Sequence, residues 1–290
     1  MSNVRHGDVG DWRLDDQEFL ASFHLPSPGL RHEALAHENP MPFEHLITFD
    51  EVEHVYTFSG KRVPRSVTKL LHTYSQDFDP LIALSIMKPE TRQDLEAIAG
   101  PEDKDIIAYW RTNGEIQRAR GQLLHYHAEQ ILNGRSVEEP HSPELRQANR
   151  IIDGFILARG LLPFRTEVCL YHKKLNIAGQ ADLLCVDPTK RLVICDWKRS
   201  RDIRMENGFR SLKEPLEHLP DSNYWLYALQ LNLYAFMLED QYGYSVSTMY
   251  LFVVHPRQAS PRIIEVPRLD IEVQLLVEHE LDKISEENLG

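Results

Sequence analysis

The feature that most constrains this chain is a pair of strongly apolar segments that carry three charged residues. The segments 177–186 and 191–199 read as strands, and the Asp-Pro-Thr-Lys sequence between them is typical of a hairpin turn. Residues i and i+2 of a strand point to the same face, so Asp196 and Lys198 project together. The hairpin brings Asp182 of the first strand within reach of Asp196.

Two carboxylates and one ammonium group on one face of a sheet suit a hard divalent cation with a positive charge next to it. On an exposed hairpin the same three residues would be an ordinary solvated face, and that alternative stays open. The nearly continuous apolar runs around them indicate strands that are covered on both faces. Charges are costly in such strands unless they are paired or bound to metal, which favours a metal site.

Two predicted helices carry further polar residues at helical spacing. Gly121, His125 and Glu129 are four residues apart and therefore share one face of a helix. On that face His125 is the candidate metal ligand, and Glu129 is placed to orient its other nitrogen, with a structural histidine near the core as the alternative. Gln230 and Tyr234 are also four residues apart, in a helix predicted nearer the C-terminus.

Together these segments resemble the PD-(D/E)XK nuclease superfamily, and within it the RecB-like branch. The resemblance covers roughly residues 45–265. Within the branch, the chain is similar to the mitochondrial genome maintenance-type and CRISPR adaptation-type exonucleases. It rests on three motifs in the order of that branch: Gly121-x-x-x-His125-x-x-x-Glu129, then Gly179-x-x-Asp182 with Asp196-x-Lys198, then Gln230-x-x-x-Tyr234.

The chain departs from the family pattern in two places. No proline directly precedes Asp182, and the four cysteines that hold an iron–sulfur cluster in some RecB-like members are not found. The three cysteines, Cys169, Cys185 and Cys195, lie in predicted strands without ligand-type spacing. We expect them to be small buried hydrophobic residues in a reducing compartment, the cytoplasm or the nucleus.

The resemblance implies both a fold and a set of roles. The fold is α/β, a mixed restriction-endonuclease-like sheet with helices on both faces, which the predicted order of helices and strands also favours. Asp182, Asp196, His125 and the backbone carbonyl of Trp197 would hold Mg²⁺ or Mn²⁺. Lys198 would position the attacking water or stabilise charge on the phosphate. Gln230 and Tyr234 would face the site and touch DNA or brace the catalytic strand, with a core-facing tyrosine and its glutamine partner as the alternative. Glu167, one strand earlier, is a further metal ligand, an outer contact or a structural residue, and the sequence leaves these three open.

The first 44 residues differ from the rest in being polar and interrupted by prolines. We therefore expect an N-terminal extension over 1–44, with a short helix over 15–23, and a nuclease domain over 45–290. Asn113-Gly114 is expected to interrupt the helix that leads into His125. A further helix is expected over 142–159, capped by its first residue.

The net charge of −12 excludes a protein that coats duplex nucleic acid non-specifically, because that affinity comes from many lysines and arginines. A basic stretch nevertheless follows the Asp-x-Lys strand. We predict that Arg199, Arg201 and Arg204 contact phosphates, with a solvated loop as the alternative. Tyr224 and Trp225 are placed either to stack on bases or to pack in the core.

These observations predict a metal-dependent deoxyribonuclease, an exonuclease that acts on DNA ends or single strands in replication, repair or recombination. One alternative is a nucleic-acid-binding module without catalysis. Another is a different metal-dependent phosphoester enzyme or an interaction scaffold. No apolar run approaches the roughly 20 residues that a membrane helix needs, so no membrane partner is expected. A homo-oligomer or a larger replication or repair complex is compatible with the sequence.

Overall fold

The computed structural model describes residues 14–23, 34–51, 53–137, 142–208 and 210–287. Contacts within the chain define two compact units. The first comprises residues 1–30 and 77–123, and the second comprises residues 31–76 and 124–290. The division expected at residue 44 stays a prediction.

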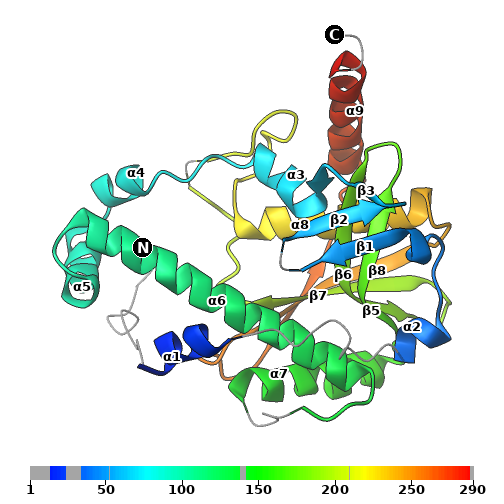
Figure 1. Cartoon of the computed structure of the whole chain (residues 1–290), viewed down its shortest axis with the longest axis horizontal. Coiled ribbons are helices and arrows are strands. Elements are labelled where there is room, and N and C mark those ends of the chain that lie inside the picture. The colour runs from blue at the N-terminus through cyan, green and yellow to red at the C-terminus, as the bar shows by residue number, and fades with distance from the viewer. Residues whose placement is uncertain (1–13, 24–33, 52, 138–141, 209, 288–290) are drawn as a thin grey trace. The chain divides into compact units, whose positions relative to one another are not determined.

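The first unit is helical. It contains α1 (Leu14–Ser22), α4 (Pro80–Ser85), α5 (Pro89–Ala99) and the first part of α6 (Asp103–Leu132) (Figure 1). α1 confirms the short helix expected over 15–23. The break expected at Asn113-Gly114 is wrong, because α6 runs through it as one helix of 30 residues. A glycine costs a helix only about 1 kcal/mol relative to alanine, which a helix of this length tolerates.

The second unit is built on a six-stranded mixed sheet. Its strands are β4 (Arg65–Ser66), β5 (Leu162–His172), β6 (Ile177–Val186), β7 (Leu192–Arg199), β8 (Val246–Val254) and β9 (Arg262–Val266). β4, β6, β7, β8 and β9 follow one another across the sheet, and β5 pairs with β6. β4 with β6 and β7 with β8 are parallel, and the other pairs are antiparallel. The mixed sheet expected from the sequence is confirmed.

The hairpin of β6 and β7 has the expected turn. Asp187 organises it, because its Oδ1 accepts hydrogen bonds from the backbone N–H groups of Thr189 and Arg191 at 2.8 and 3.0 Å. The hydroxyl of Thr189 donates to the same oxygen, and these bonds hold the pKa of Asp187 down at about 2. Leu183 lies opposite Cys195 in the resulting antiparallel register.

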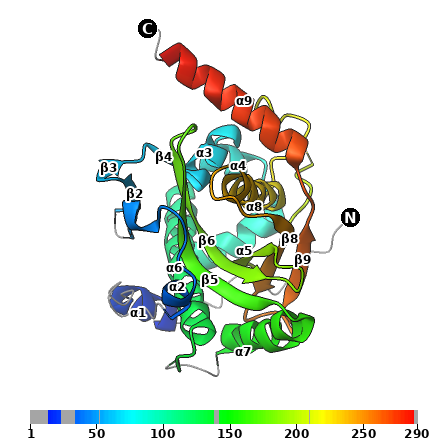
Figure 2. The same ribbon diagram turned by 90° about the vertical axis from the view of Figure 1, so that its right-hand side faces the viewer.

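Apolar clusters cover both faces of the sheet. One cluster joins the sheet to α3 (Val67–Tyr74), α8 (Asn223–Asp240) and α9 (Asp270–Glu287). The other joins it to the end of α6 and to α7 (Pro143–Ile151). α7 and α8 lie on opposite sides of the strands in both views (Figures 1 and 2). The strands are therefore covered on both faces, as their apolar runs predict.

The helix expected over 142–159 begins where predicted, with the hydroxyl of Ser142 accepting from the N–H of Leu145. Its hydrogen bonding then changes. A π-helix follows over Ile152–Ile156 and a 3₁₀ turn over Leu157–Arg159, so the α-helix itself is shorter than expected. Among the described helices, none has the combination of length and apolar composition that a membrane crossing requires.

A smaller antiparallel sheet of β1 (Ile47–Asp50), β2 (Val55–Phe58) and β3 (Lys61–Arg62) packs against β5. Ahead of it, α2 (Ala34–Glu38) and the next residues are bound to β5. Asn39 Nδ2 donates to the carbonyl of Phe164 at 3.1 Å, and Glu44 forms an ion pair with the buried Arg165. Residues 34–44 are thus attached to the second unit. Cys185 and Cys195 are buried as expected, whereas Cys169 is half-buried.

Candidate active site

The site forms where β6 changes partners along one edge. β4 pairs with Ile177 and Ala178, whereas β7 pairs with β6 only from Leu183 onward. Asp182 lies in the interval between the two partners. Its Oδ2 accepts the backbone N–H of Trp197 at 2.8 Å, so a carboxylate bridges the strands where their ladder ends.

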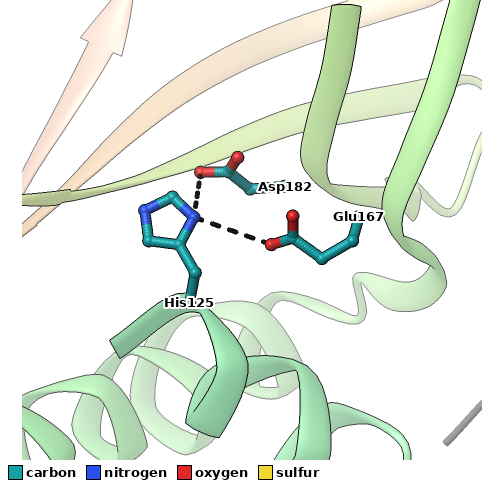
Figure 3. Close-up of side chains that lie close together, drawn as sticks. All are labelled: His125, Glu167 and Asp182. Carbon is teal, nitrogen blue, oxygen red and sulfur yellow. Dashed lines mark ion pairs between the residues drawn. The ribbon is translucent and has the colours of Figure 1, made fainter. Parts of the chain in front are cut away.

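His125, near the end of α6, faces this interval. Its Nε2 lies 2.9 Å from the carbonyl oxygen of Trp197, which can only accept, so Nε2 carries a hydrogen. Its Nδ1 lies 3.4 Å from Oδ2 of Asp182 and 3.6 Å from Oε1 of Glu167. Figure 3 shows the two carboxylates converging on that nitrogen. The sequence suggested Glu129 for orienting the ring, but the carbonyl of Trp197 has that position.

The charges at this cluster are unbalanced. Burial alone would lower the pKa of His125, but the carboxylates of Asp182 and Glu167 raise it to about 9. Burial raises the pKa of Asp182, and the negative charge of Glu167 raises it further, against the opposing effect of His125. The cluster therefore favours an added positive charge, which a proton on Nδ1 or a cation can supply.

Asp196 and Lys198 share one face of β7, as the alternation predicts, and form an ion pair with Nζ 2.6 Å from Oδ2. Asp196 is 1% exposed, and its burial, with the charge of Asp182, raises its pKa to about 6 despite the opposing effect of Lys198. For Lys198 burial acts to lower the pKa, but the two carboxylates outweigh it and raise the pKa. The ammonium also lies 4.6 Å from the ring centre of Tyr227.

Glu167 is held in an unusual backbone conformation. Its φ is +47°, a left-handed value that costs a residue with a side chain about 1 kcal/mol or more. The side chain of Gln180, on the neighbouring strand, donates to the carbonyl of Glu167 at 3.0 Å. This strained position puts a second carboxylate, after that of Asp182, against His125, and strain of this kind clusters at functional sites.

Gln230 and Tyr234 lie on α8, with the Gln230 amide donating to the Tyr234 hydroxyl at 3.1 Å. Tyr234 packs tightly on Gly179, where a Cβ would come within 2.5 Å of its ring. Burial, together with the nearby charges of Asp182 and Asp196, raises the pKa of Tyr234. The two residues share a helix face, as expected, and Gly179 is required for the close approach of the tyrosine.

The donor set fits a divalent cation. One ligand atom each from His125, Glu167 and Asp182 lie within 4.8 Å of one another. Nδ1 of His125 lies 3.4 and 3.6 Å from the two carboxylate oxygens, separations that ligands at about 2.1 Å from a common ion can have. Two carboxylates with one imidazole suit Mg²⁺ or Mn²⁺. Among the described residues, Asp196 is not part of this cluster, and its Oδ2 forms an ion pair with Lys198. Metal ligation by Asp196 and by the carbonyl of Trp197 stays a prediction.

Arg199, expected to contact phosphate, lies on the other face of β7 from Lys198. It alternates with Lys198 and therefore lies on the opposite face of β7, together with Trp197. Its guanidinium is bound to Glu144 of α7 at 2.9–3.0 Å and its side chain is only 6% exposed. This position does not support a phosphate contact at the site.

Arg201 and Arg204 are exposed in the loop after β7, and Arg204 pairs with Asp202 at 3.3 Å. Their role in phosphate binding stays a prediction. Tyr224 is buried in the core, and the indole N–H of Trp225 donates to the carbonyl of Met205. These positions favour packing over base stacking for both aromatic residues.

Two residues near the site were not singled out from the sequence. Tyr227 precedes Gln230 by three positions and Tyr234 by seven, so its helical spacing was a usable signal. Tyr56 of β2 is buried, and its burial and the nearby Tyr234, Cys169 and Glu167 raise its pKa. The approach of Tyr56 to the site depends on how the small sheet packs on β5, and the sequence has no local signal for that packing.

Residues 95–288, well over half of the chain, match the family model of the PD-(D/E)XK nuclease superfamily. Among curated proteins none matches the sequence. A candidate exonuclease from Eubacterium rectale is similar in structure at 16% identity and a TM-score of 0.36, over 67% of this chain and 78% of that one. The protein SSO0001 is similar at 16% identity and a TM-score of 0.31, over 73% and 83%. At these TM-scores the likeness carries no further conclusion. The mixed sheet with helices on both faces fits the restriction-endonuclease-like fold of the matched superfamily, as expected.

Proposed function

Because this chain belongs to the PD-(D/E)XK nuclease superfamily, and is thus a metal-dependent nuclease, we propose that it hydrolyses DNA as an exonuclease. The substrates proposed are single strands and duplex ends, and the setting is replication, repair or recombination. The observation that carries the proposal is the cluster of His125, Glu167 and Asp182 beside the buried pair of Asp196 and Lys198. Action on free ends rests on the motifs shared with the RecB-like branch.

The metal proposed is Mg²⁺ or Mn²⁺, held by Nδ1 of His125 and the carboxylates of Asp182 and Glu167, with Asp196 as a further ligand. Ligation by the carbonyl of Trp197, also proposed, requires its hydrogen bond with Nε2 of His125 to break. When bound, such an ion neutralises charge on the phosphodiester and makes a water molecule a better nucleophile. The hydrogen bond from Nε2 to Trp197 leaves Nδ1 as the ligating nitrogen of His125.

Lys198 is proposed as the residue that stabilises the developing charge on the phosphate. Asp196 and the ring of Tyr227 fix its ammonium group, so little reorganisation is needed when the transition state forms. Gln230 and Tyr234 are proposed to brace the strand that bears Asp182, since Tyr234 packs on Gly179 of that strand. Arg201 and Arg204 are proposed to contact phosphates outside this cluster.

The test is a titration of Mg²⁺, Mn²⁺ and Ca²⁺ with end-labelled DNA. Linear single strands, blunt duplexes, closed circles and RNA of the same sequence are compared. We expect shortening of linear DNA with Mg²⁺ or Mn²⁺ and none of closed circles. Cleavage of circles would contradict the exonuclease assignment. Metal-independent binding without cleavage of any substrate would instead support the binding-module alternative.

A further inference from the structure

Three segments on the α7 side of the sheet are held together as one surface. The side-chain amide of Gln147 on α7 donates to the carbonyls of His255 and Gln258 in the loop after β8, at 2.8 and 3.0 Å. Gln258 in turn donates to the carbonyl of Arg201 at 3.0 Å, and Arg150 donates to that of Ala259 at 3.3 Å. α7 and the segments that follow β7 and β8 are therefore fixed relative to one another.

This surface carries exposed arginines from all three segments. We call it the arginine surface, defined by Arg146, Arg150, Arg201 and Arg257. These four positive side chains lie on a chain whose net charge is −12. At His255, burial first and then the charge of Arg199 lower the pKa to about 4 against the opposing charge of Glu144, with smaller contributions from Arg257 and Arg201.

The arginine surface contains a shallow hollow of about 460 Å³ on α7 and the π-helix that follows it. It is lined by Arg146, Asn149, Arg150, Asp153 and Gly154, so it holds two guanidinium groups and one carboxylate. A methyl group added at Gly154 would meet no atom within 4 Å, so the space there is open. Arg146 and Arg150 are one helical turn apart on α7, and two guanidinium groups at that spacing suit a phosphate group.

We propose that the arginine surface binds backbone phosphates of the nucleic-acid strand beyond the phosphodiester that is cut. Arg201 follows Lys198 by three residues, at most about 10 Å of extended chain, so the surface begins close to the site. Arg146 and Arg150 continue it across α7. The inference rests on the proposed function for its ligand, but it concerns residues that lie outside the metal cluster.

Binding measured without metal separates this inference from catalysis. A labelled single-stranded oligonucleotide is titrated in EDTA by fluorescence anisotropy, over a range of salt concentrations. For Arg146→Gln with Arg150→Gln, we expect affinity to fall about 10-fold. The slope of log affinity against log salt should flatten by about 1.4, or about 0.7 for each single-strand phosphate that is no longer neutralised. The matched control, Lys173→Gln with Lys174→Gln, removes two exposed lysines from the β5–β6 turn and should leave the slope as in the native protein.

A second variant adds charge instead of removing an arginine. Asn149→Glu places a carboxylate in the hollow and should weaken DNA binding in the same assay, while the melting temperature stays as in the native protein. For the arginine pair, the ratio of kcat/KM for a long over a short oligonucleotide should fall by about 10-fold, since only the long strand reaches α7.

The outcomes distinguish the two proposals. If DNA binding depends on the arginines but no substrate is cleaved, the proposed hydrolysis of DNA is contradicted and the proposed arginine surface is supported. If cleavage depends on metal but the salt slope is the same in the native protein, the arginine variant and Asn149→Glu, the proposed arginine surface is contradicted and the proposed nuclease activity is supported. Absence of DNA binding in EDTA would also overturn it. So would binding of an acidic peptide at the arginine surface that DNA does not displace.

Discussion

The two faces of β7 both bury charge, but they do so in different ways. On the α7 face, Arg199 is matched by Glu144, one cation by one anion, in contact at 2.9 Å. On the α8 face, Asp196 and Lys198 form a similar pair. There, however, Asp182 and Glu167 add two negative charges next to the pair, and His125 is the one cationic partner that the described cluster offers them. The first face holds a closed ion pair, and the second favours a further cation.

This difference shows why buried charge alone does not mark a functional site. A balanced buried pair supports the fold, because removing either partner leaves the other uncompensated. Burial raises the pKa of Asp196, and the neighbouring carboxylate of Asp182 raises it further, so the group favours a further proton or a bound cation. The imbalance, rather than the burial, distinguishes the candidate site.

The largest expected effect concerns catalysis on the α8 face. Lys198→Ala or Asp196→Asn should lower kcat/KM for DNA by about 10³-fold or more, because about 4 kcal/mol of transition-state stabilisation disappears. Arg199→Ala, on the other face, should leave the activity of the folded fraction near the native value. Cleavage rates of purified protein, corrected for the folded fraction by circular dichroism, check this. Native-like turnover by Lys198→Ala would contradict the assignment of catalysis to the α8 face.

The second prediction concerns the stability of the metal-free protein. Arg199→Ala should lower the free energy of unfolding by about 3 kcal/mol, because it leaves Glu144 buried without its cation. Asp196→Asn should raise the free energy of unfolding at pH 8. The folded-state pKa of Asp196 is about 6, above its ordinary value, so ionising it costs stability as pH rises through that range.

Urea unfolding at pH 4 and pH 8, with EDTA, measures both effects. At pH 4 the carboxyl of Asp196 is protonated in the fold, so the advantage of Asn should largely disappear. A destabilised Asp196→Asn at pH 8 would mean that the pair with Lys198 outweighs the burial of the carboxylate, as on the α7 face.

The third prediction concerns His125. Its pKa of about 9 means that a metal must displace a proton from it at neutral pH. Between about pH 6.5 and 9, Mn²⁺ affinity should therefore rise about tenfold for each unit of pH. His125→Ala should weaken Mn²⁺ binding by about 10-fold or more and flatten this dependence. Calorimetric titration in buffers of different ionisation enthalpy reports the released proton, and His127→Ala, outside the cluster, is the control. Equal effects from the two variants would show that the ligating face of α6 has been assigned wrongly.

The smallest expected effect concerns Tyr227. Its ring lies under the ammonium of Lys198, so Tyr227→Leu should lower kcat by about 5- to 10-fold, consistent with about 1 kcal/mol for such an interaction. Tyr227→Phe keeps the ring and should restore most of the rate. If Phe and Leu are equally impaired, the hydroxyl of Tyr227 matters rather than its ring.

Local patterns in the sequence predicted much of this fold. The alternation of Asp196, Trp197 and Lys198 placed two charges on one face and the tryptophan on the other, as found. The same alternation assigns Arg199 to the tryptophan face, and only its basic neighbours suggested otherwise. The helix break at Asn113-Gly114 was wrong because the pattern of a long helix outweighs one glycine.

The sequence by itself determined the hairpin of β6 and β7 and the cover on both faces of these strands. It also determined that His125 shares a helix face with Gly121 and Glu129, and that Gln230 shares one with Tyr234. These depend on periodicities of two and 3.6 residues, which act over a few neighbouring positions. Only the tertiary structure decided that Glu167, in a left-handed conformation, faces His125, that Asp196 pairs with Lys198 outside the donor cluster, and that arginines from α7 and two loops form one surface. Those contacts join residues far apart in the chain, and they depend on how strands and helices pack, which no local pattern encodes.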